Sequence, residues 1–445
     1  MKQTDGLILS CILLVYLFVG SLYAAYTPAW QAPDEPAHYN YVRQLAAGKL
    51  PVIEPGDYDQ KYIETIVGSR FDPQYSVAPL SYEDWQPPLY YLLQTPVYWL
   101  SGGSLLALRL FSLLLGAGVV AMGYGVARRV FPEQRWVAAT TAVFIAFLPQ
   151  HLAILASVNN DSLAELLIGG ILFVLLGLLE IGDWRSEIGR KQLVLLGVLL
   201  GLGFLTKAMV YLLAPVAGLV ILWRYRENWG GLWQTAVLAF APALMLGLFW
   251  WGRNVIVYDG LDIMASAAHS SVVVGQPRTA EWVAKYGVDG TLSRFATTTF
   301  NSFWGQFGWM AVPMPRWVYI PLILFTLLVL IGLLIHWRTK PTPHPTPHSK
   351  SDHSPLPTLM LFLTLLLTLT LYLGYNLVFV QHQGRYLFPA LIPIGLGVAL
   401  GLGSWLQPFA RRWPILPNLL PLGLAVALVG LDLLALFRFI IPNLT

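Results

Sequence analysis

The chain has 445 residues, of which 56% are hydrophobic and only 11% are charged. A soluble domain is about 25% charged, and a soluble fold of this length exposes a large polar surface, so the composition excludes a soluble protein. The formal charge of +4 does not indicate a nucleic-acid partner, because basic residues accumulate in the cytoplasmic loops of membrane proteins. We therefore expect an all-α, polytopic integral membrane protein surrounded by membrane lipids.

About eleven apolar runs come close to the roughly 17–25 residues that a transmembrane helix needs. The first run is longer than the core of a usual signal peptide and follows a weak positive charge, so we expect it to be retained. The runs 192–206 and 208–224 are short and adjoin at Lys207; they alternatively form one broken hairpin. The runs lie near 6–26, 104–127, 136–155, 158–182, 192–206, 208–224, 232–252, 317–337, 357–380, 387–406 and 415–438.

Basic residues are unevenly divided between the two sets of connections. With the N-terminus inside, five cytoplasmic connections are rich in Arg and Lys, whereas the short outer connections hold little beyond Lys207 and Arg385. This positive-inside pattern predicts that two long loops, about 27–103 and 253–316, lie on the non-cytoplasmic side. The cytoplasmic cations are Arg128, Arg129, Arg135, Arg185, Arg190, Lys191, Arg224, Arg226, Arg338, Lys340, Lys350, Arg411 and Arg412.

Both outer loops are rich in aromatic and charged residues, which is typical of folded segments rather than linkers. In the first loop, a helix is expected after Pro36, a residue that a first helical turn tolerates. The segment "PPLYYLLQTPVYWLS" is apolar but too short to span, so we expect a helix on the outer interface. Its expected anchors are Tyr90, Tyr91, Tyr98 and Trp99.

The connection 338–356 is rich in proline and low in complexity, which predicts a mobile cytoplasmic linker. Three histidines in it, His344, His348 and His353, have no cysteine or paired acid beside them. We therefore expect no metal site there.

Two adjacent acids, Asp34 and Glu35, follow the first span directly. Neighbouring carboxylates raise each other's pKa, and the flanking prolines Pro33 and Pro36 restrict the backbone that carries them. Such a pair suits a general base, a ligand of a divalent metal ion or a binder of hydroxyl groups. The alternative is an N-terminal cap on the following helix, and one residue can serve both roles.

A second polar cluster, Asn159, Asn160 and Asp161, stands at the outer end of the fourth run, with Glu165 one turn later. An acid inside a membrane usually has a function. Near a helix start, however, Asn and Asp most often cap the helix, and we favour that role.

Four outer cations lie beside apolar helices: Arg385, Lys207, Arg253 and Arg109. Such side chains bind phosphate, which arginine does through its bidentate fork, or they extend to the interface along the membrane surface. We expect interfacial extension for Arg109. We expect phosphate binding for the other three, with Gly384 allowing a close backbone approach beside Arg385. Because the sequence lacks a Walker loop, HExxH and CxxC, ATP hydrolysis and a structural zinc site are not expected.

The motifs "PDEPAHYNYVRQLA" and "QPPLYYLL" resemble the GT-C superfamily of polytopic glycosyltransferases, nearest to its protein O-mannosyltransferases and lipid A aminoarabinose transferase. The likeness continues through "NNDSLAELL", "LTKAMVYLLAPVAG", "FWGQFGWMAVPMPRWVY" and "QGRYLFPAL", so it covers most of the chain. It implies one GT-C-like membrane domain over 1–445. It also implies transfer of a sugar from a polyprenyl-phosphate donor to a lipid, glycan or protein acceptor on the outer face.

The resemblance also assigns roles to residues. Asp34 matches the catalytic acid and Glu35 its partner, while Arg385, Lys207 and, with them, Arg253 are expected to bind the donor phosphate. Cations stabilise a leaving phosphate, a carboxylate base activates the acceptor hydroxyl, and a single displacement inverts the anomeric centre. The acceptor or sugar is expected to contact His38, Tyr39, Gln86, Asp161, Gln383 and Tyr386.

Two other classes of function remain open. A transporter or flippase would use Asp34, Glu35, Asp161 and Arg385 as substrate or proton sites. Transport sites usually lie at mid-membrane depth, however, and Asp432 is the one isolated acid well inside a span. A non-catalytic assembly protein would tolerate the loss of Asp34. The compact length and the lack of a soluble C-terminal domain favour a bacterial plasma-membrane enzyme, with its site facing outward, over an oligosaccharyltransferase.

Overall fold

Four stretches of the chain are described by the structure, a computed structural model: residues 3–180, 186–339, 356–410 and 412–445. Over them the chain is almost entirely helical, and its two short strands, β1 (Gln306–Phe307) and β2 (Val312–Pro313), pair antiparallel. The prediction of an all-α polytopic membrane protein is confirmed. Nearly all of the linker predicted over 338–356 lies outside the described stretches, with all three of its histidines: His344, His348 and His353.

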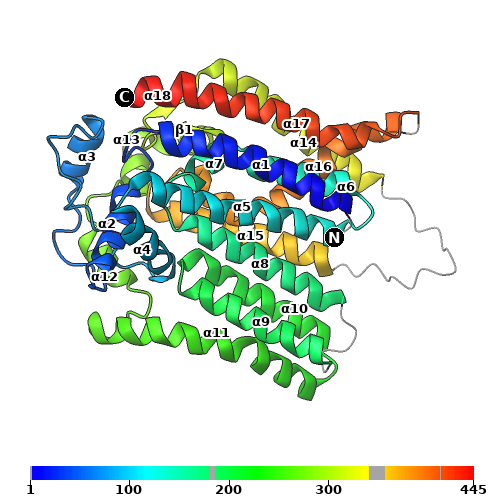
Figure 1. The fold of residues 1–445 in the computed structure, drawn as a ribbon, viewed down its shortest axis with the longest axis horizontal. Coiled ribbons are helices and arrows are strands. Elements are labelled where there is room, and N and C mark those ends of the chain that lie inside the picture. The colour runs from blue at the N-terminus through cyan, green and yellow to red at the C-terminus, as the bar shows by residue number, and fades with distance from the viewer. Residues whose placement is uncertain (1–2, 181–185, 340–355, 411) are drawn as a thin grey trace.

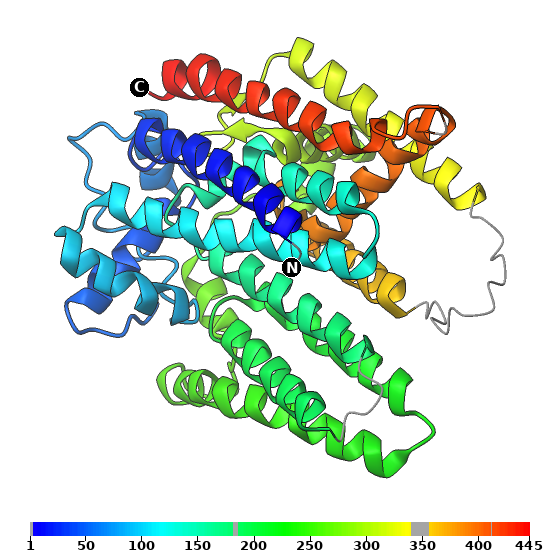
Figure 2. The same ribbon diagram turned by 45° about the vertical axis from the view of Figure 1, so that its right-hand side comes forward.

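Long apolar helices run roughly alongside one another and form the bundle in Figure 1. Figure 2 shows α9 to α11 on one side of it and the C-terminal helices on the other. The bundle helices are α1 (Gln3–Tyr26), α5 (Leu105–Val130), α6 (Arg135–Ala146), α7 (Pro149–Leu155), α8 (Asp161–Glu180), α9 (Glu187–Phe204), η1 (Ala208–Leu212), α10 (Leu213–Tyr225), α11 (Trp229–Val257), α14 (Arg316–Arg338), α15 (Leu356–Val378), η2 (Gly384–Ala390), α16 (Leu391–Ala410), α17 (Leu416–Leu434), η3 (Ala435–Ile440) and α18 (Ile441–Leu444).

The number of spans differs slightly from the expected eleven. Among the described residues, nine helices are long and apolar enough to cross a membrane, or ten if the bent pair of α6 and α7 is one span. That pair bends by 65°, and Pro149 begins its second half. The remaining predicted run forms α9, whose first turns hold three charged residues: Glu187, Arg190 and Lys191. It is a separate helix from α10, so the break predicted near Lys207 is present.

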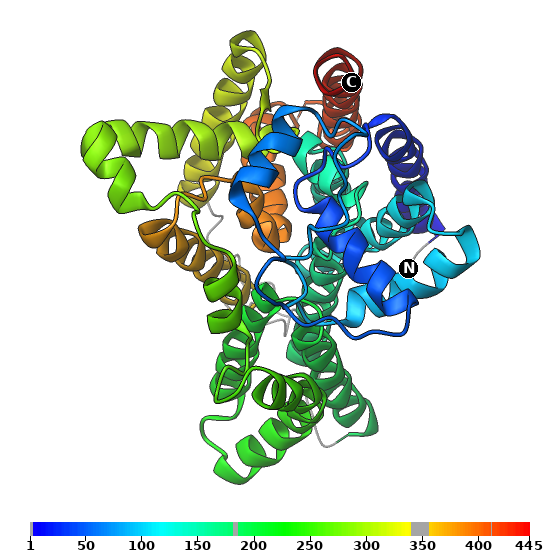
Figure 3. The ribbon, with the colours of Figure 1, turned by 90° about the vertical axis from the view of Figure 1, so that its left-hand side faces the viewer.

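Both long loops fold at the same end of the bundle, called here the loop end (Figures 1 and 3). They contact each other there: the Ile53 backbone N–H donates to Tyr258 at 3.2 Å, and the Trp309 indole donates to the Trp30 carbonyl at 2.9 Å. The loop-end elements are α2 (Glu35–Ala46), α3 (Gln60–Gly68), α4 (Leu89–Ser101), α12 (Ser266–Val272), α13 (Thr279–Trp304), β1 and β2.

The apolar segment of the first loop forms α4 as expected, but not all of its aromatic residues lie at a surface. Tyr90 and Tyr91 are fully buried; the Tyr91 ring stacks on Tyr41 of α2 with centroids 3.7 Å apart. Only Trp99 of the predicted anchors is largely exposed. The expectation that Tyr90 and Tyr91 anchor the helix at the interface is therefore wrong, because α4 packs these rings against α2 and α5.

Candidate active site

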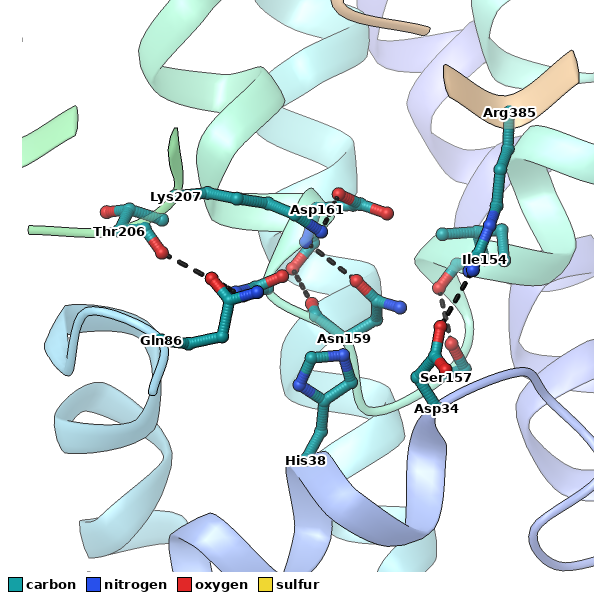
Figure 4. Close-up of polar contacts among 12 residues, drawn as sticks. Asp34, His38, Gln86, Ile154, Ser157, Asn159, Asp161, Thr206, Lys207 and Arg385 are labelled. Atoms are coloured by element: carbon teal, nitrogen blue, oxygen red, sulfur yellow. Dashed lines mark hydrogen bonds and ion pairs between the residues drawn. The ribbon is translucent and has the colours of Figure 1, made fainter. Parts of the chain in front are cut away.

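A cavity of about 480 Å³ lies at the loop end, between both long loops and the ends of several bundle helices. Eight of the eleven predicted site residues line it, although they come from five separate parts of the chain. Figure 4 shows several of them facing one another. The eight are Asp34, His38, Gln86, Asp161, Lys207, Gln383, Arg385 and Tyr386.

Asp34 occupies the N-cap position of α2, yet its side chain makes no capping hydrogen bond. Its carboxylate accepts from Arg385 at 2.7 Å and from the Tyr82 hydroxyl at 3.1 Å instead. The Asp34 backbone is left-handed, with φ 67°, a conformation that disfavours a non-glycine residue by roughly 1–2 kcal/mol. Strain of this kind often marks a functional position, and here it turns the carboxylate toward the cavity.

Arg385 is the second residue of η2, directly after Gly384. The Gly384 backbone N–H donates to the Ser302 hydroxyl at 2.7 Å, and a Cβ at this glycine would collide with the backbone of Thr299 and Phe303. The close approach expected at Gly384 is therefore made to α13. It fixes the start of η2 and so directs the Arg385 side chain toward Asp34.

Lys207 forms the second ion pair of the cavity, with 2.6 Å between its Nζ and the Asp161 carboxylate. Lys207 has an extended backbone in the break between α9 and η1, while Asp161 begins α8. The predicted cap is supplied by Asn159, whose side-chain oxygen accepts from the Asp161 backbone N–H at 2.9 Å. The Asp161 carboxylate is thereby left for the lysine (Figure 4).

Glu35 lies outside the cavity, in a buried bidentate ion pair with Arg109. The two nitrogen–oxygen distances are 2.8 and 2.6 Å, and Glu35 also accepts from the Val158 backbone N–H at 3.1 Å. The expectation that Arg109 extends to the interface is wrong, because only 3% of the residue is exposed. This pair joins the first outer loop to α5 and to the turn before α8.

Arg253 and Tyr39 also lie outside the cavity. Arg253 donates to the Pro51 carbonyl and to the Tyr258 hydroxyl, and its guanidinium covers the Trp250 ring. Tyr39 donates to the Gly103 carbonyl at 2.8 Å. Arg253 thus holds the first outer loop against the end of α11, and Tyr39 joins two segments within that loop.

Several cavity residues were not singled out in the sequence. They come from both long loops, and no local pattern distinguished them; the acidic pair Glu83 and Asp84 was the one available signal. Those that bear on charge and on stacking are Tyr58, Tyr82, Glu83, Trp85, His269 and Trp309.

The titratable groups of the cavity differ in their charge. Burial acts to raise the pKa of Asp34, but the charge of Arg385 and its hydrogen bond outweigh burial, so the pKa of this carboxyl is lowered. Burial lowers the pKa of His38 to about 3 and that of His269 to about 4. Burial raises the pKa of Glu83 to about 8, and the negative charge of Asp34 adds to the rise. At neutral pH, Asp34 is therefore ionised, and both histidines are neutral.

Asp34 and Glu35, which the sequence suggested as possible ligands of a divalent metal ion, do not converge in this structure. The two carboxylates pair with different arginines, Arg385 and Arg109, and only Asp34 reaches the cavity. Nowhere in the described stretches do three or more His, Cys, Asp or Glu side chains gather closely enough to hold a metal ion together.

An apolar groove adjoins the polar cavity. It has a volume of about 140 Å³ and shares three lining residues with the cavity: Met209, Tyr375 and Tyr386. Leu212 and Leu371 also line it, from η1 and α15. Further along α10 and α15, a second apolar hollow of about 500 Å³ is lined by Leu219, Leu222, Trp223, Leu359 and Leu363, among others.

Residues 81–393, more than half of the chain, match one protein family, described as predicted membrane protein (DUF2142). The chain is a member of the DUF2142 family. No curated protein matches it in sequence.

Solved structures with the same arrangement of helices belong to the GT-C glycosyltransferases. ArnT from Cupriavidus metallidurans, bound to undecaprenyl phosphate, matches with a TM-score of 0.54 at 16% identity, over 100% of the DUF2142 chain and 74% of ArnT. The oligosaccharyltransferase of Archaeoglobus fulgidus, tethered to an acceptor peptide, matches with a TM-score of 0.54 at 13% identity, over 98% of this chain.

The DUF2142 chain spans 54% of that oligosaccharyltransferase. A chain of the O-mannosyltransferase complex Pmt1-Pmt2 of S. cerevisiae matches with a TM-score of 0.42 at 18% identity. The match covers 55% of the DUF2142 chain and 32% of the yeast chain. The GT-C polytopic fold inferred from the sequence motifs is confirmed.

Proposed function

We propose that this DUF2142 protein is a glycosyltransferase that moves a sugar from a polyprenyl-phosphate-linked donor to an acceptor. The observation that carries the proposal is the polar cavity, with Asp34, Arg385 and Lys207 on its wall, next to an apolar groove. One site thus combines a carboxylate, two cations and a surface for a lipid chain, which are the three parts that this reaction needs.

Arg385 and Lys207 bind the donor phosphate in this proposal. Each is paired with a carboxylate, at 2.7 and 2.6 Å, so neither bears an uncompensated charge while the site is empty of substrate. A phosphate oxygen can replace a carboxylate oxygen on either cation, because both anions suit the same donors. The apolar groove beside Tyr386 accommodates the isoprenoid chain. The undecaprenyl phosphate bound to ArnT, a protein of the same fold, supports a lipid of this class.

Asp34 acts as the base. The acceptor oxygen forms a bond with the anomeric carbon as the bond from that carbon to the phosphate oxygen breaks. The bonding electron pair leaves on the phosphate, and the acceptor proton moves to the Asp34 carboxylate. A displacement in one step inverts the anomeric centre. The lowered pKa of Asp34 keeps it ionised at neutral pH, while Arg385 and Lys207 stabilise the departing charge.

The site belongs on the outer face of the plasma membrane in this proposal. It lies at the loop end, whereas Arg128, Arg135, Arg224 and Arg338 stand at helix ends that the positive-inside rule assigns to the cytoplasm. The acceptor in this proposal is a lipid, glycan or protein. Its hydroxyl group must reach Asp34.

Mass spectrometry of lipid-linked sugars in a bacterial deletion strain tests the proposal. The donor is expected to accumulate in the deletion strain and to return to its normal level with the wild-type protein or with Glu54→Gln, an exposed acid of the same loop. Asp34→Asn should fail to restore it although the protein is present in the membrane. Full complementation by Asp34→Asn would contradict the proposal and favour an assembly protein.

A further inference from the structure

Glu83 is a carboxyl group of the cavity wall that lacks a cation of its own. Lys207 pairs with Asp161 and Arg385 with Asp34, but among the described residues no ion pair involves Glu83. Its Oε2 atom is buried and has no hydrogen-bond partner there. A buried carboxyl oxygen without a partner is unfavourable, so this atom is a candidate contact for a bound ligand.

The charges on the cavity wall indicate which form of Glu83 suits that ligand. The wall has three acids, Asp34, Glu83 and Asp161, against two cations. With Glu83 ionised the wall is negative overall and repels a phosphate. With Glu83 protonated the wall is balanced, and the acid offers an O–H donor that a phosphate oxygen accepts.

Building on the proposed function, we infer that Glu83 binds the donor as a neutral carboxylic acid, donating a hydrogen bond to the lipid phosphate held by Lys207 and Arg385. Asp34 and Glu83 then divide two roles within one cavity, the first ionised and the second protonated. Glu83 keeps its proton throughout in this role. Two carboxyl groups whose surroundings separate their proton affinities are a known arrangement for such a division.

Glu83 is the wall residue whose charge changes between about pH 6.5 and about pH 9. Its pKa is raised to about 8, first by burial and next by Asp34, while Lys207, Arg385 and the Gln86 amide act the other way. His38 and His269, with pKa values of about 3 and 4, are neutral over this interval, and Asp34 has a lowered pKa. The acid of Asp161 is paired with Lys207.

The remaining groups near Glu83 are Asp84 and several phenols. Burial raises the pKa of Asp84 to about 8, but its carboxylate accepts from Gln44 at 2.7 Å and does not line the cavity. Asp84 is present in every variant tested, so the comparison with Glu83→Gln cancels its titration. Tyr82 and Tyr91 have pKa values well above the ordinary range because they are buried, and Tyr375 faces Glu83 from α15. Phenols titrate near pH 10 or higher, so they do not ionise in the interval tested.

The test measures undecaprenyl phosphate binding to the full-length protein in lipid nanodiscs at about pH 6.5 and about pH 9. The variants are Glu83→Gln, which keeps an N–H donor without a charge, Glu83→Ala, which removes the donor, and Glu54→Gln as an exposed control of the same loop. The probe itself loses a proton near pH 6, so each pH response is expressed relative to Glu83→Gln. Thermal unfolding of each variant checks its fold.

The wild-type affinity relative to that of Glu83→Gln is expected to fall about tenfold between the two pH values. At about pH 6.5, Glu83→Gln should bind within about twofold of wild type, Glu83→Ala roughly fivefold more weakly, and Glu54→Gln unchanged. An equal pH response in wild type and Glu83→Gln would overturn this inference alone, as would a large loss of binding in Glu83→Gln at the lower pH. Absence of binding to the wild type at both pH values would overturn the proposed function and the inference with it.

Discussion

The Arg385 guanidinium donates to the Asp34 carboxylate across 2.7 Å, joining residues that lie 351 positions apart in the chain. This contact connects the loop that follows α1 with the start of η2, so the integrity of the cavity depends on both ends of the sequence. Charge-assisted bonds of this kind are about twice as strong as neutral ones.

Replacing Arg385 should weaken binding of the lipid phosphate more than it weakens folding. Arg385→Lys retains the charge but loses the planar fork, so we expect a partial loss of affinity. Arg385→Ala removes a charged donor and should reduce affinity for undecaprenyl phosphate by roughly thirtyfold to a hundredfold. Titration calorimetry in nanodiscs measures both values. Equal affinities for Arg385→Ala and wild type would exclude Arg385 as a phosphate ligand.

The adjacent acids should respond differently to substitution. Asp34→Asn is expected to lower sugar transfer by a factor of about 10²–10⁴, the usual contribution of a general base. Its effect on stability should be smaller than that of Glu35→Gln, because the Asp34 side chain is 24% exposed at the cavity, whereas that of Glu35 is fully buried. Glu35→Gln leaves the buried Arg109 charge without its partner and should destabilise the protein by about 3 kcal/mol or more. Thermal unfolding and accumulation of the lipid-linked donor are compared for the two variants. A stable but inactive Glu35→Gln would instead indicate that Glu35 takes part in the reaction, as the sequence suggested.

The raised pKa of Glu83 predicts a pH-dependent difference in stability. Between the ordinary pKa of a glutamate and the folded value of about 8, the folded state binds one more proton than the unfolded state, so stability falls as pH rises. Glu83→Gln does not bind this proton, so its stability does not fall in this way. The free energy of unfolding of Glu83→Gln minus that of wild type should therefore be larger at pH 8 than at pH 5 by at least about 1 kcal/mol. Unfolding temperatures of both proteins at the two pH values provide the measurement. A constant difference would show that Glu83 titrates normally.

Filling the apolar groove should distinguish the contribution of the lipid chain to binding from that of the phosphate. Leu371→Trp places a larger side chain in the groove lined by Tyr375 and Tyr386, and we expect affinity for undecaprenyl phosphate to fall about tenfold or more. Binding of inorganic phosphate should stay the same. Leu366→Trp is the matched control, because Leu366 is similarly exposed on α15 but lines neither apolar hollow. Equal losses for both ligands would indicate a change in the polar cavity instead.

Much of the architecture was predictable, since apolar runs long enough to span a bilayer have few other structures available to them. The residues of the cavity were predictable in part, because Lys207 and Arg385 are cations on a side with few others. The residues with which these side chains pair could not be predicted. Asp34 and Glu35 are neighbours in sequence, but the left-handed backbone at Asp34 and the helical backbone at Glu35 send their carboxylates in different directions. Arg109 belongs to a run that is apolar on every side, so hydropathy could not indicate which face is buried.

The two ion pairs of the cavity also bear on how the product would leave in the proposed reaction. When a lipid phosphate leaves, Asp34 and Asp161 can pair again with Arg385 and Lys207. Release therefore exchanges one anion for another, and neither cation is left without a partner. In the proposed reaction, the protein's own carboxylates thus compete with the lipid phosphate for both cations. This competition lowers the affinity of the site for donor and product alike, which favours rapid turnover over tight binding of the lipid carrier.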